Sequence, residues 1–152
     1  MVKIKVYLDN CAYNRPFDDQ EQIRIFLEAE AKKHIQRLIV EQKIDLAYSF
    51  INRFENSKNP HSSNKNAINT FFTNAALYID HTHAAGVGSR AIGIMRSGIK
   101  TRDAYHISSA IEGGCDCFVT TDKTLLNYKT GEIIICDPIQ FLDHYYEEHK
   151  NG

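Results

Sequence analysis

Two acidic residues stand directly after apolar, strand-like segments of the sequence. Asp9 follows Val6-Tyr7-Leu8, and Asp122 follows Val119-Thr120-Thr121. Apolar and β-branched residues in such short runs predict buried strands. The carboxyl ends of parallel strands lie on one edge of a sheet, where ligands bind in open α/β proteins. The sequence therefore predicts that Asp9 and Asp122 project onto the same edge.

Two further acids are placed near that edge by the elements that carry them. Asp103 lies in the first turn of a helix predicted over 101–112, which leads directly into the strand that ends before Asp122. A helix that runs antiparallel to its strand begins above the carboxyl end of that strand, so Asp103 and Asp122 are expected to meet. Glu55 closes a short predicted helix that follows a strand over 46–49, within one helical turn of the same edge, with Asn52 or Asn56 as the alternative inward-facing polar group of that helix.

Four carboxylates that converge without a Lys or Arg between them repel and raise one another's pKa unless a cation neutralises them. Oxygen ligands suit hard ions such as Mg²⁺ or Mn²⁺, which also bind substrate phosphate, and we expect one or two ions in the site. The reaction that this favours is metal-assisted phosphodiester hydrolysis by an activated water. The candidate catalytic and metal-binding residues are therefore Asp9, Glu55, Asp103 and Asp122.

Strands and helices alternate along the whole chain. The predicted strands cover 3–8, 46–49, 77–80, 117–120 and 133–136. The predicted helices cover 20–42, 50–56, a segment from Ser62 or Ser63 through Ala75, 83–97, 101–112, and a last segment from Pro138 through Tyr145. Short Val- and Ile-rich strands that are apolar on both faces predict an α/β fold, with a central, mostly parallel sheet flanked by helices on both sides.

The helix over 20–42 has the clearest amphipathic pattern. Its apolar residues recur at spacings of three and four, which predicts one buried stripe. The stripe consists of Ile23, Phe26, Leu27, Ala31, Ile35, Leu38 and Ile39. Four charged residues are expected to lie outside it, namely Arg24, Glu28, Lys32 and Arg37.

Length and charge exclude several classes of protein. A chain of 152 residues is long enough to fold around one hydrophobic core, so we expect a single domain over 1–152. The formal net charge is -1, which lacks the basic excess of proteins that bind nucleic acid by bulk electrostatics. No run of about 18 apolar residues and no signal-peptide pattern occurs, so we expect a cytoplasmic protein without a membrane span.

Three acidic segments stand out together: 6–9 (VYLD), 98–110 (GIKTRDAYHISSA) and 117–123 (CFVTTDK). They resemble the motifs of the PIN-domain ribonucleases, which include the VapC-type toxins of bacterial toxin–antitoxin pairs. The resemblance implies a PIN-like three-layer fold and divalent-metal-dependent endonucleolytic cleavage of RNA. It also implies that Asp9, Glu55, Asp103 and Asp122 bind the metal and that the Thr121 hydroxyl lies beside them.

The chain departs from the usual PIN pattern in two places. Asn10 stands where the family commonly has Thr or Ser, which keeps a hydrogen-bonding group in the metal's surroundings. The loop Asn14-Arg15-Pro16-Phe17-Asp18-Asp19 is longer and more distinctive than in common toxins, which indicates a subgroup with its own substrate. Toxin status therefore does not follow from the motifs alone. We also expect an antitoxin partner and a homodimer. The segment His61–Phe72 and the apolar tail at 141–146 would form a docking surface or pack into the core.

Two residues near the acids each allow two interpretations. Arg15 suits bidentate contact with a substrate phosphate, or an ion pair with the acids at the end of its own loop. His106 falls one turn after Asp103 on the same helix face, where it is either a buried structural residue or a supporting group and proton relay for the carboxylates.

The sequence is compatible with three functions. The favoured one is a metal-dependent endoribonuclease. The first alternative is a PIN-like module that binds RNA or protein with little catalysis, and the second is a DNA-directed nuclease with the same metal chemistry. The acids contact metal and phosphate, neither of which distinguishes ribose from deoxyribose.

Overall fold

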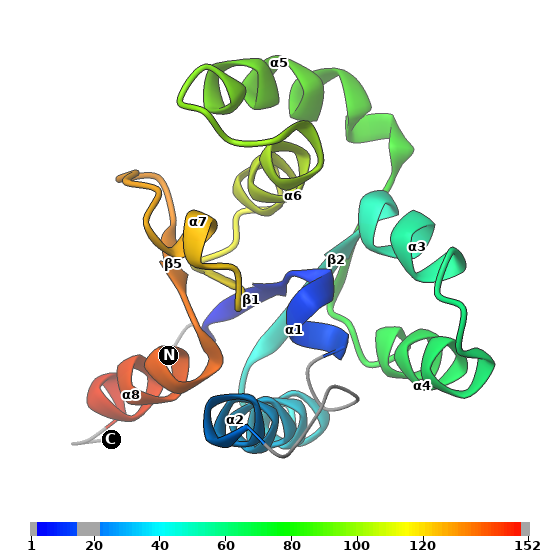
Figure 1. Ribbon diagram of the computed structural model, residues 1–152, viewed down its shortest axis with the longest axis vertical. Helices are drawn as coiled ribbons and strands as arrows, with labels where there is room; N and C mark the ends of the chain where they lie inside the picture. Colours follow the sequence, from blue (N-terminus) through cyan, green and yellow to red (C-terminus); the bar gives the residue numbers. More distant parts are fainter. Residues whose placement is uncertain (1–2, 15–21, 150–152) are drawn as a thin grey trace.

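The computed structural model describes residues 3–14 and 22–149, and its centre is a five-stranded, fully parallel sheet. The strands lie in the order β3-β2-β1-β4-β5, so β1 pairs with β2 on one side and with β4 on the other (Figure 1). In the register, Val6 of β1 lies opposite Leu46 of β2 and Cys117 of β4. The strands are β1 (Lys5–Leu8), β2 (Asp45–Ser49), β3 (Leu77–Ile79), β4 (Cys117–Val119) and β5 (Ile134–Cys136).

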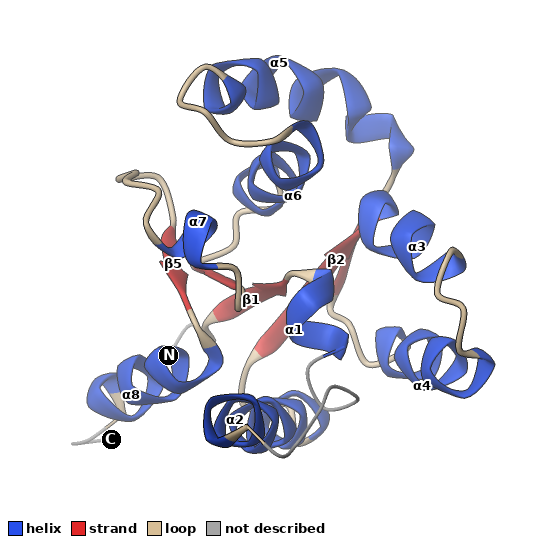
Figure 2. Cartoon of the chain, in the orientation of Figure 1, coloured by secondary structure: helices blue, strands red, loops and turns tan. Residues whose placement is uncertain are grey.

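Helices cover both faces of the sheet, which confirms the predicted three-layer α/β fold (Figure 2). One face packs against α1 (Asn10–Asn14), α2 (Ile23–Val40), α4 (Ser62–Phe72) and α8 (Pro138–Glu148). The other packs against α5 (Ala84–Met95), α6 (Thr101–Glu112) and α7 (Lys123–Leu126). The remaining helix is α3 (Phe50–Ser57), and a 3-10 turn, η2 (His81–His83), precedes α5. The strands are buried on both sides, as the Val- and Ile-rich runs predicted.

Residue alternation along β1 divides its side chains between the two cores. Val6 and Leu8 pack into the core beneath α2 and α8, whereas Tyr7 packs into the opposite core beside Phe118. The Tyr7 and Phe118 rings are stacked with centroids 5.5 Å apart. Because β1 ends at Leu8, the next residue, Asp9, lies at the carboxyl edge of the sheet.

The predicted buried stripe of the long helix is wrong in its N-terminal half. Ile23 is 76% exposed and Phe26 is 46% exposed, whereas Glu28 and Lys32 are buried. At 100° per residue, a straight line of buried positions runs through 28, 32, 35 and 39, and Ile23 and Phe26 fall on the opposite side of the helix. Burial lowers the pKa of the Lys32 ammonium to about 7.

Two short helices were not predicted from the sequence, because each has only one turn or little more. α1 begins directly after Asp9, and α7 begins directly after Asp122. Both therefore start at the edge where the carboxylates were expected. The other predicted elements are present within a few residues of their expected bounds, and α6 has the predicted bounds. Arg15 and most of the loop that contains it lie outside the described residues.

The apolar tail belongs mainly to the core. Phe141 and Tyr145 of α8 are buried beneath the sheet, and Phe71 and Phe72 of α4 are buried in the same cluster. Tyr146 is half exposed, and its hydroxyl lies 2.5 Å from Nε2 of His34. Among the described helices, none is long and apolar enough to cross a membrane.

Candidate functional site

Asp9 lies at the end of β1 with its carboxylate held from the neighbouring strand. The hydroxyl of Thr120, just past β4, donates to Oδ2 of Asp9 at 2.9 Å, and the Cys11 thiol donates to the same oxygen at 3.2 Å. Asp9 is buried, so these two donors replace water around one of its oxygens. Burial and the charge of Asp9 raise the pKa of Cys11 to about 12, so the thiol is neutral and acts as a donor.

Asp122 lies at the next strand end and begins α7. Its Oδ1 accepts from the backbone N–H of Thr124 at 2.8 Å, and its own N–H donates to Oγ1 of Thr120 at 3.1 Å. The hydroxyl beside Asp9 is therefore that of Thr120, a residue that the sequence analysis did not single out. Thr121, the expected hydroxyl, is buried, and its backbone N–H donates to Sγ of Cys11 at 3.4 Å.

Glu55 reaches the same region from α3, where it meets a buried histidine. Nε2 of His106 contacts Oε1 of Glu55 and lies 4.0 Å from Oδ1 of Asp9. On the other side of the ring, the hydroxyl of Tyr7 lies 2.6 Å from Nδ1 of His106 and 2.6 Å from Oγ of Ser49. A buried hydrogen-bonded chain thus runs from β2 through β1 to the carboxylate of Glu55.

The imidazole of His106 is the group that lies between the two acids. Burial alone would disfavour its charged form, but the hydrogen bond to Glu55 and the charges of Asp9 and Asp103 raise its pKa. Because a carboxylate oxygen accepts hydrogen bonds, Nε2 is the donor in its contact with Glu55. The position supports the interpretation of His106 as a group that holds Glu55 in place.

Asp103 projects from the first turn of α6 into the same field of negative charge. Partial burial and the charges of Asp9, Asp122 and Glu55 raise the pKa of its carboxyl. Each of the other three acids thus lies within electrostatic reach of Asp103. Arg102 also faces these acids, and its Nη1 lies 4.0 Å from Oε2 of Glu55.

Asn52 joins α3 to the end of β1. Its Nδ2 donates to the Leu8 carbonyl at 3.2 Å and to Oδ1 of Asn10 at 2.9 Å, while its Oδ1 accepts from the Ser49 N–H at 2.9 Å. Asn10 therefore faces Asn52. Asn52 and Asn56 are both buried, as the sequence allowed, and the spacing Ser49-x-x-Asn52 is that of a capping box, which signals the start of α3.

The donor set fits a hard divalent cation, because four carboxylates supply oxygen ligands and one of them already has a raised pKa. Within 3–14 and 22–149, no three His, Cys, Asp or Glu side chains are arranged as a metal-ligand cluster. The acids surround the edge of the sheet, and Glu55 is turned toward His106.

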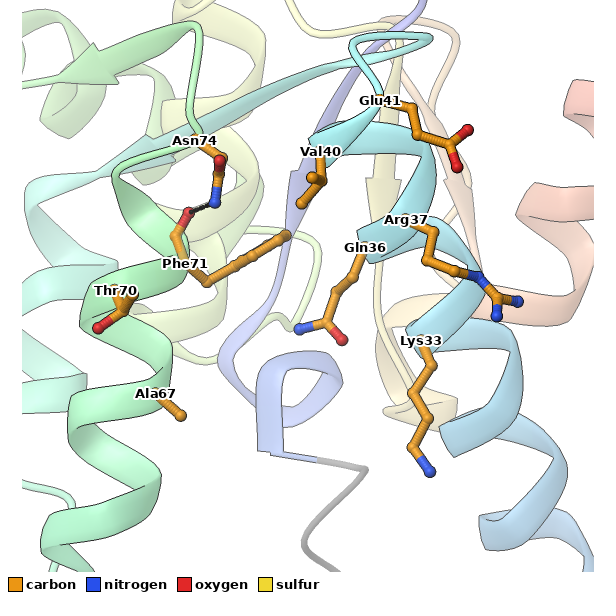
Figure 3. A pocket seen from close by; sticks show the side chains of 9 residues that line it. All are labelled: Lys33, Gln36, Arg37, Val40, Glu41, Ala67, Thr70, Phe71 and Asn74. Atoms are coloured by element: carbon orange, nitrogen blue, oxygen red, sulfur yellow. Dashed lines mark hydrogen bonds between the residues drawn. The ribbon is translucent and has the colours of Figure 1, made fainter.

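A separate cavity of about 440 Å³ lies between α2 and α4 (Figure 3). Figure 3 shows Gln36 and Val40 of α2 on the side that faces α4, with the Phe71 ring of α4 pointing toward them. Of the described residues that line this cavity, none is one of the four acids. The cavity is a groove between helices and is distinct from the carboxylate edge.

The comparisons with known proteins support the fold. No family model matches the sequence, and no curated protein matches it. Among solved structures, a chain of FitAcB from Neisseria gonorrhoeae is similar over 88% of this chain and 98% of that chain, with 19% identity and a TM-score of 0.53. At this identity the likeness concerns the fold, and it is that of a PIN-like α/β protein.

Proposed function

We propose that the protein is a divalent-metal-dependent endoribonuclease, with Asp9, Glu55, Asp103 and Asp122 as the ligands of Mg²⁺ or Mn²⁺. The observation that carries the proposal is that Asp9, Asp122 and Glu55 lie close enough to Asp103, at the carboxyl edge of a PIN-like parallel sheet, for their charges to raise the pKa of its carboxyl. When bound, such an ion activates water and stabilises the charge that develops on a phosphodiester. The motif resemblance to VapC-type toxins supports RNA as the substrate.

The supporting residues have positioning roles in this proposal. Thr120 and Cys11 fix one oxygen of Asp9, and the other oxygen, Oδ1, lies 4.0 Å from Nε2 of His106. The Tyr7–His106 pair holds a proton against Glu55 and keeps that carboxylate at the edge of the sheet. Asn52 fixes the start of α3 to the end of β1, so that Asp9 and Glu55 keep their separation.

The test is cleavage of single-stranded and structured RNA by the purified protein in Mn²⁺, Mg²⁺ or EDTA. We expect cleavage with either metal and none in EDTA. A double variant Asp9→Ala, Asp103→Ala should be inactive, whereas a control double variant Asp143→Ala, Glu147→Ala on the exposed side of α8 should cleave as the wild type does. Equal activity of the wild type and the Asp9, Asp103 variant would refute the proposal. DNA of the same sequence distinguishes a ribonuclease from a DNA-directed enzyme.

A binding module without catalysis is the second candidate. It is favoured by the finding that no three His, Cys, Asp or Glu side chains of the described residues form a metal-ligand cluster. Calorimetric titration with Mn²⁺ separates the two functions. Heat of binding that is lost in the Asp9, Asp103 variant supports the nuclease. RNA binding without any Mn²⁺ affinity supports the module.

We further propose that the protein acts as the toxin of a type II toxin–antitoxin pair, in which a small antitoxin protein is its partner. The motif resemblance and the PIN-like fold support this role. Induced expression should arrest growth of a bacterial host, and coexpression of a small protein encoded beside it should restore growth. Size-exclusion measurement of the purified chain tests the expected homodimer.

A further inference from the structure

Helix α3 is inverted with respect to the usual burial of residue types. Its two buried side chains are Asn52 and Asn56, whereas Phe54 is 63% exposed. A single exposed apolar side chain is common on protein surfaces. An exposed Phe between two buried amides on an eight-residue helix is a stronger signal, because a rotation of the helix about its axis would bury the ring and leave the helix intact.

Hydrogen bonds hold the helix in this orientation. Asn52 bonds to β1, and Nδ2 of Asn56 donates to the Lys65 carbonyl at 3.0 Å and to Oδ1 of Asn69 at 2.9 Å on α4. Rotation of α3 would break these buried bonds, each expensive to leave unmade. The exposure of Phe54 is therefore imposed by the fold.

Phe54 borders a cavity of about 330 Å³ that adjoins the carboxylate edge. Glu55 lines the same cavity, as do the cationic residues Lys58 and Arg102. Nζ of Lys58 lies over the Phe54 ring, 5.4 Å from its centroid. The cavity thus combines an aromatic face with two positive charges next to one of the proposed metal ligands.

We propose that this cavity binds one unpaired nucleotide of single-stranded RNA, with the base stacked on Phe54 and the adjoining phosphates paired with Lys58 and Arg102. The inference rests on the proposed function and specifies its substrate class. Aromatic side chains beside cations are the means by which proteins hold single strands. A base within a duplex is stacked on its neighbours and is not available to the ring.

The position of the cavity explains why a nucleotide is the occupant. Glu55 belongs to both the cavity and the carboxylate edge, so a nucleotide stacked on Phe54 places its neighbouring phosphodiester toward Asp9 and Asp103. Lys58 is exposed and flexible, and it exchanges the ring face for a phosphate when the base arrives. Phe54 therefore selects unpaired substrate and aligns it.

Binding of a short RNA that contains 2-aminopurine tests the proposal, measured in EDTA so that no cleavage occurs. Anisotropy gives the affinity, and quenching of 2-aminopurine reports stacking. Loss of one stacked base weakens binding by about 5- to 150-fold. We expect this loss for Phe54→Ala and for Phe54→Leu, which keeps an apolar side chain without a π-face, and we expect recovery for Phe54→Trp. Phe26→Ala, which removes an exposed Phe from α2, is the matched control and should bind normally.

An RNA with abasic sites completes the design. The wild type should bind it as weakly as Phe54→Ala binds the intact strand, and the variant should lose nothing further. Unchanged affinity and quenching in Phe54→Ala, or an equal loss for a duplex of the same sequence, would overturn the stacking proposal. RNA cleavage that persists in that case leaves the proposed function standing. A wild type that neither binds nor cleaves RNA with Mn²⁺ overturns both.

Discussion

Replacement of Asn52 by Ala tests whether one buried amide holds the two halves of the site together. The amide makes three hydrogen bonds within 3.2 Å: to the Leu8 carbonyl, to Oδ1 of Asn10, and from the Ser49 N–H. Leu8 and Ser49 are fully buried, so water does not replace the lost partner at either backbone group. Asn10 is partly exposed, so its oxygen is hydrated in the variant.

The expected loss of stability follows from the two buried backbone groups. Each buried group left without a partner costs about 1–3 kcal/mol, so Asn52→Ala should lower the free energy of unfolding by about 2–6 kcal/mol. This is a large share of the 5–15 kcal/mol typical of a domain. With a urea m-value of about 2 kcal/mol/M, the unfolding midpoint should fall by about 1–3 M.

Urea unfolding followed by circular dichroism measures this loss. The matched control is Asn66→Ala, which removes an exposed amide on α4 and should change stability by about 0.5 kcal/mol or less. Because Asn52 also separates Asp9 from Glu55, the folded variant should bind Mn²⁺ more weakly at a concentration of urea far below its midpoint. A loss under about 1 kcal/mol would refute the reasoning, since it would mean that the Leu8 carbonyl and the Ser49 N–H find other partners.

Three further predictions concern buried polar groups. Asp103→Asn removes a carboxylate whose ionisation opposes folding above its raised pKa, so at pH 7 the metal-free variant should have a higher melting temperature than the wild type. The variant should gain less stability from Mn²⁺ than the wild type, for which Mn²⁺ at 100 times its Kd adds about 2.7 kcal/mol, or about 5–11 °C in melting temperature. The pKa of Lys32 is lowered from 10.5 to about 7, so between pH 7 and 10.5 the unfolded chain binds one proton more than the folded chain and wild-type stability rises with pH. Lys32→Met should flatten this rise in urea titrations at pH 7 to 10, and an equal pH dependence of stability in both proteins would contradict the prediction. Tyr7→Phe leaves Nδ1 of buried His106 without its partner and should cost about 1–3 kcal/mol in the same assay, whereas no loss would show that the hydroxyl is dispensable.

Local sequence was sufficient for most elements and for the placement of the acids. The helix Thr101–Glu112 and the strands around Val6, Leu46 and Val119 have strong periodicity or apolar runs, and parallel strands put their carboxyl ends on one edge. Asp9, Asp103 and Asp122 were therefore placed near one another from the chain alone. The short helices after Asp9 and Asp122 were not predicted, because a single turn carries little periodic signal.

The partners of each acid depended on tertiary structure. Tyr7, Ser49 and His106 come from three elements, and they meet only because β1 lies beside β2 with α6 across that face. The burial of Glu28 and the exposure of Phe54 contradict the polarity of both residues, since hydrogen bonds and packing to other elements decide which face of a helix is covered. Sequence by itself determined that four acids lie near one sheet edge. Strand order and helix rotation decided which groups hold those acids and where an aromatic ring stands beside them, because both arise from contacts between segments distant in the chain.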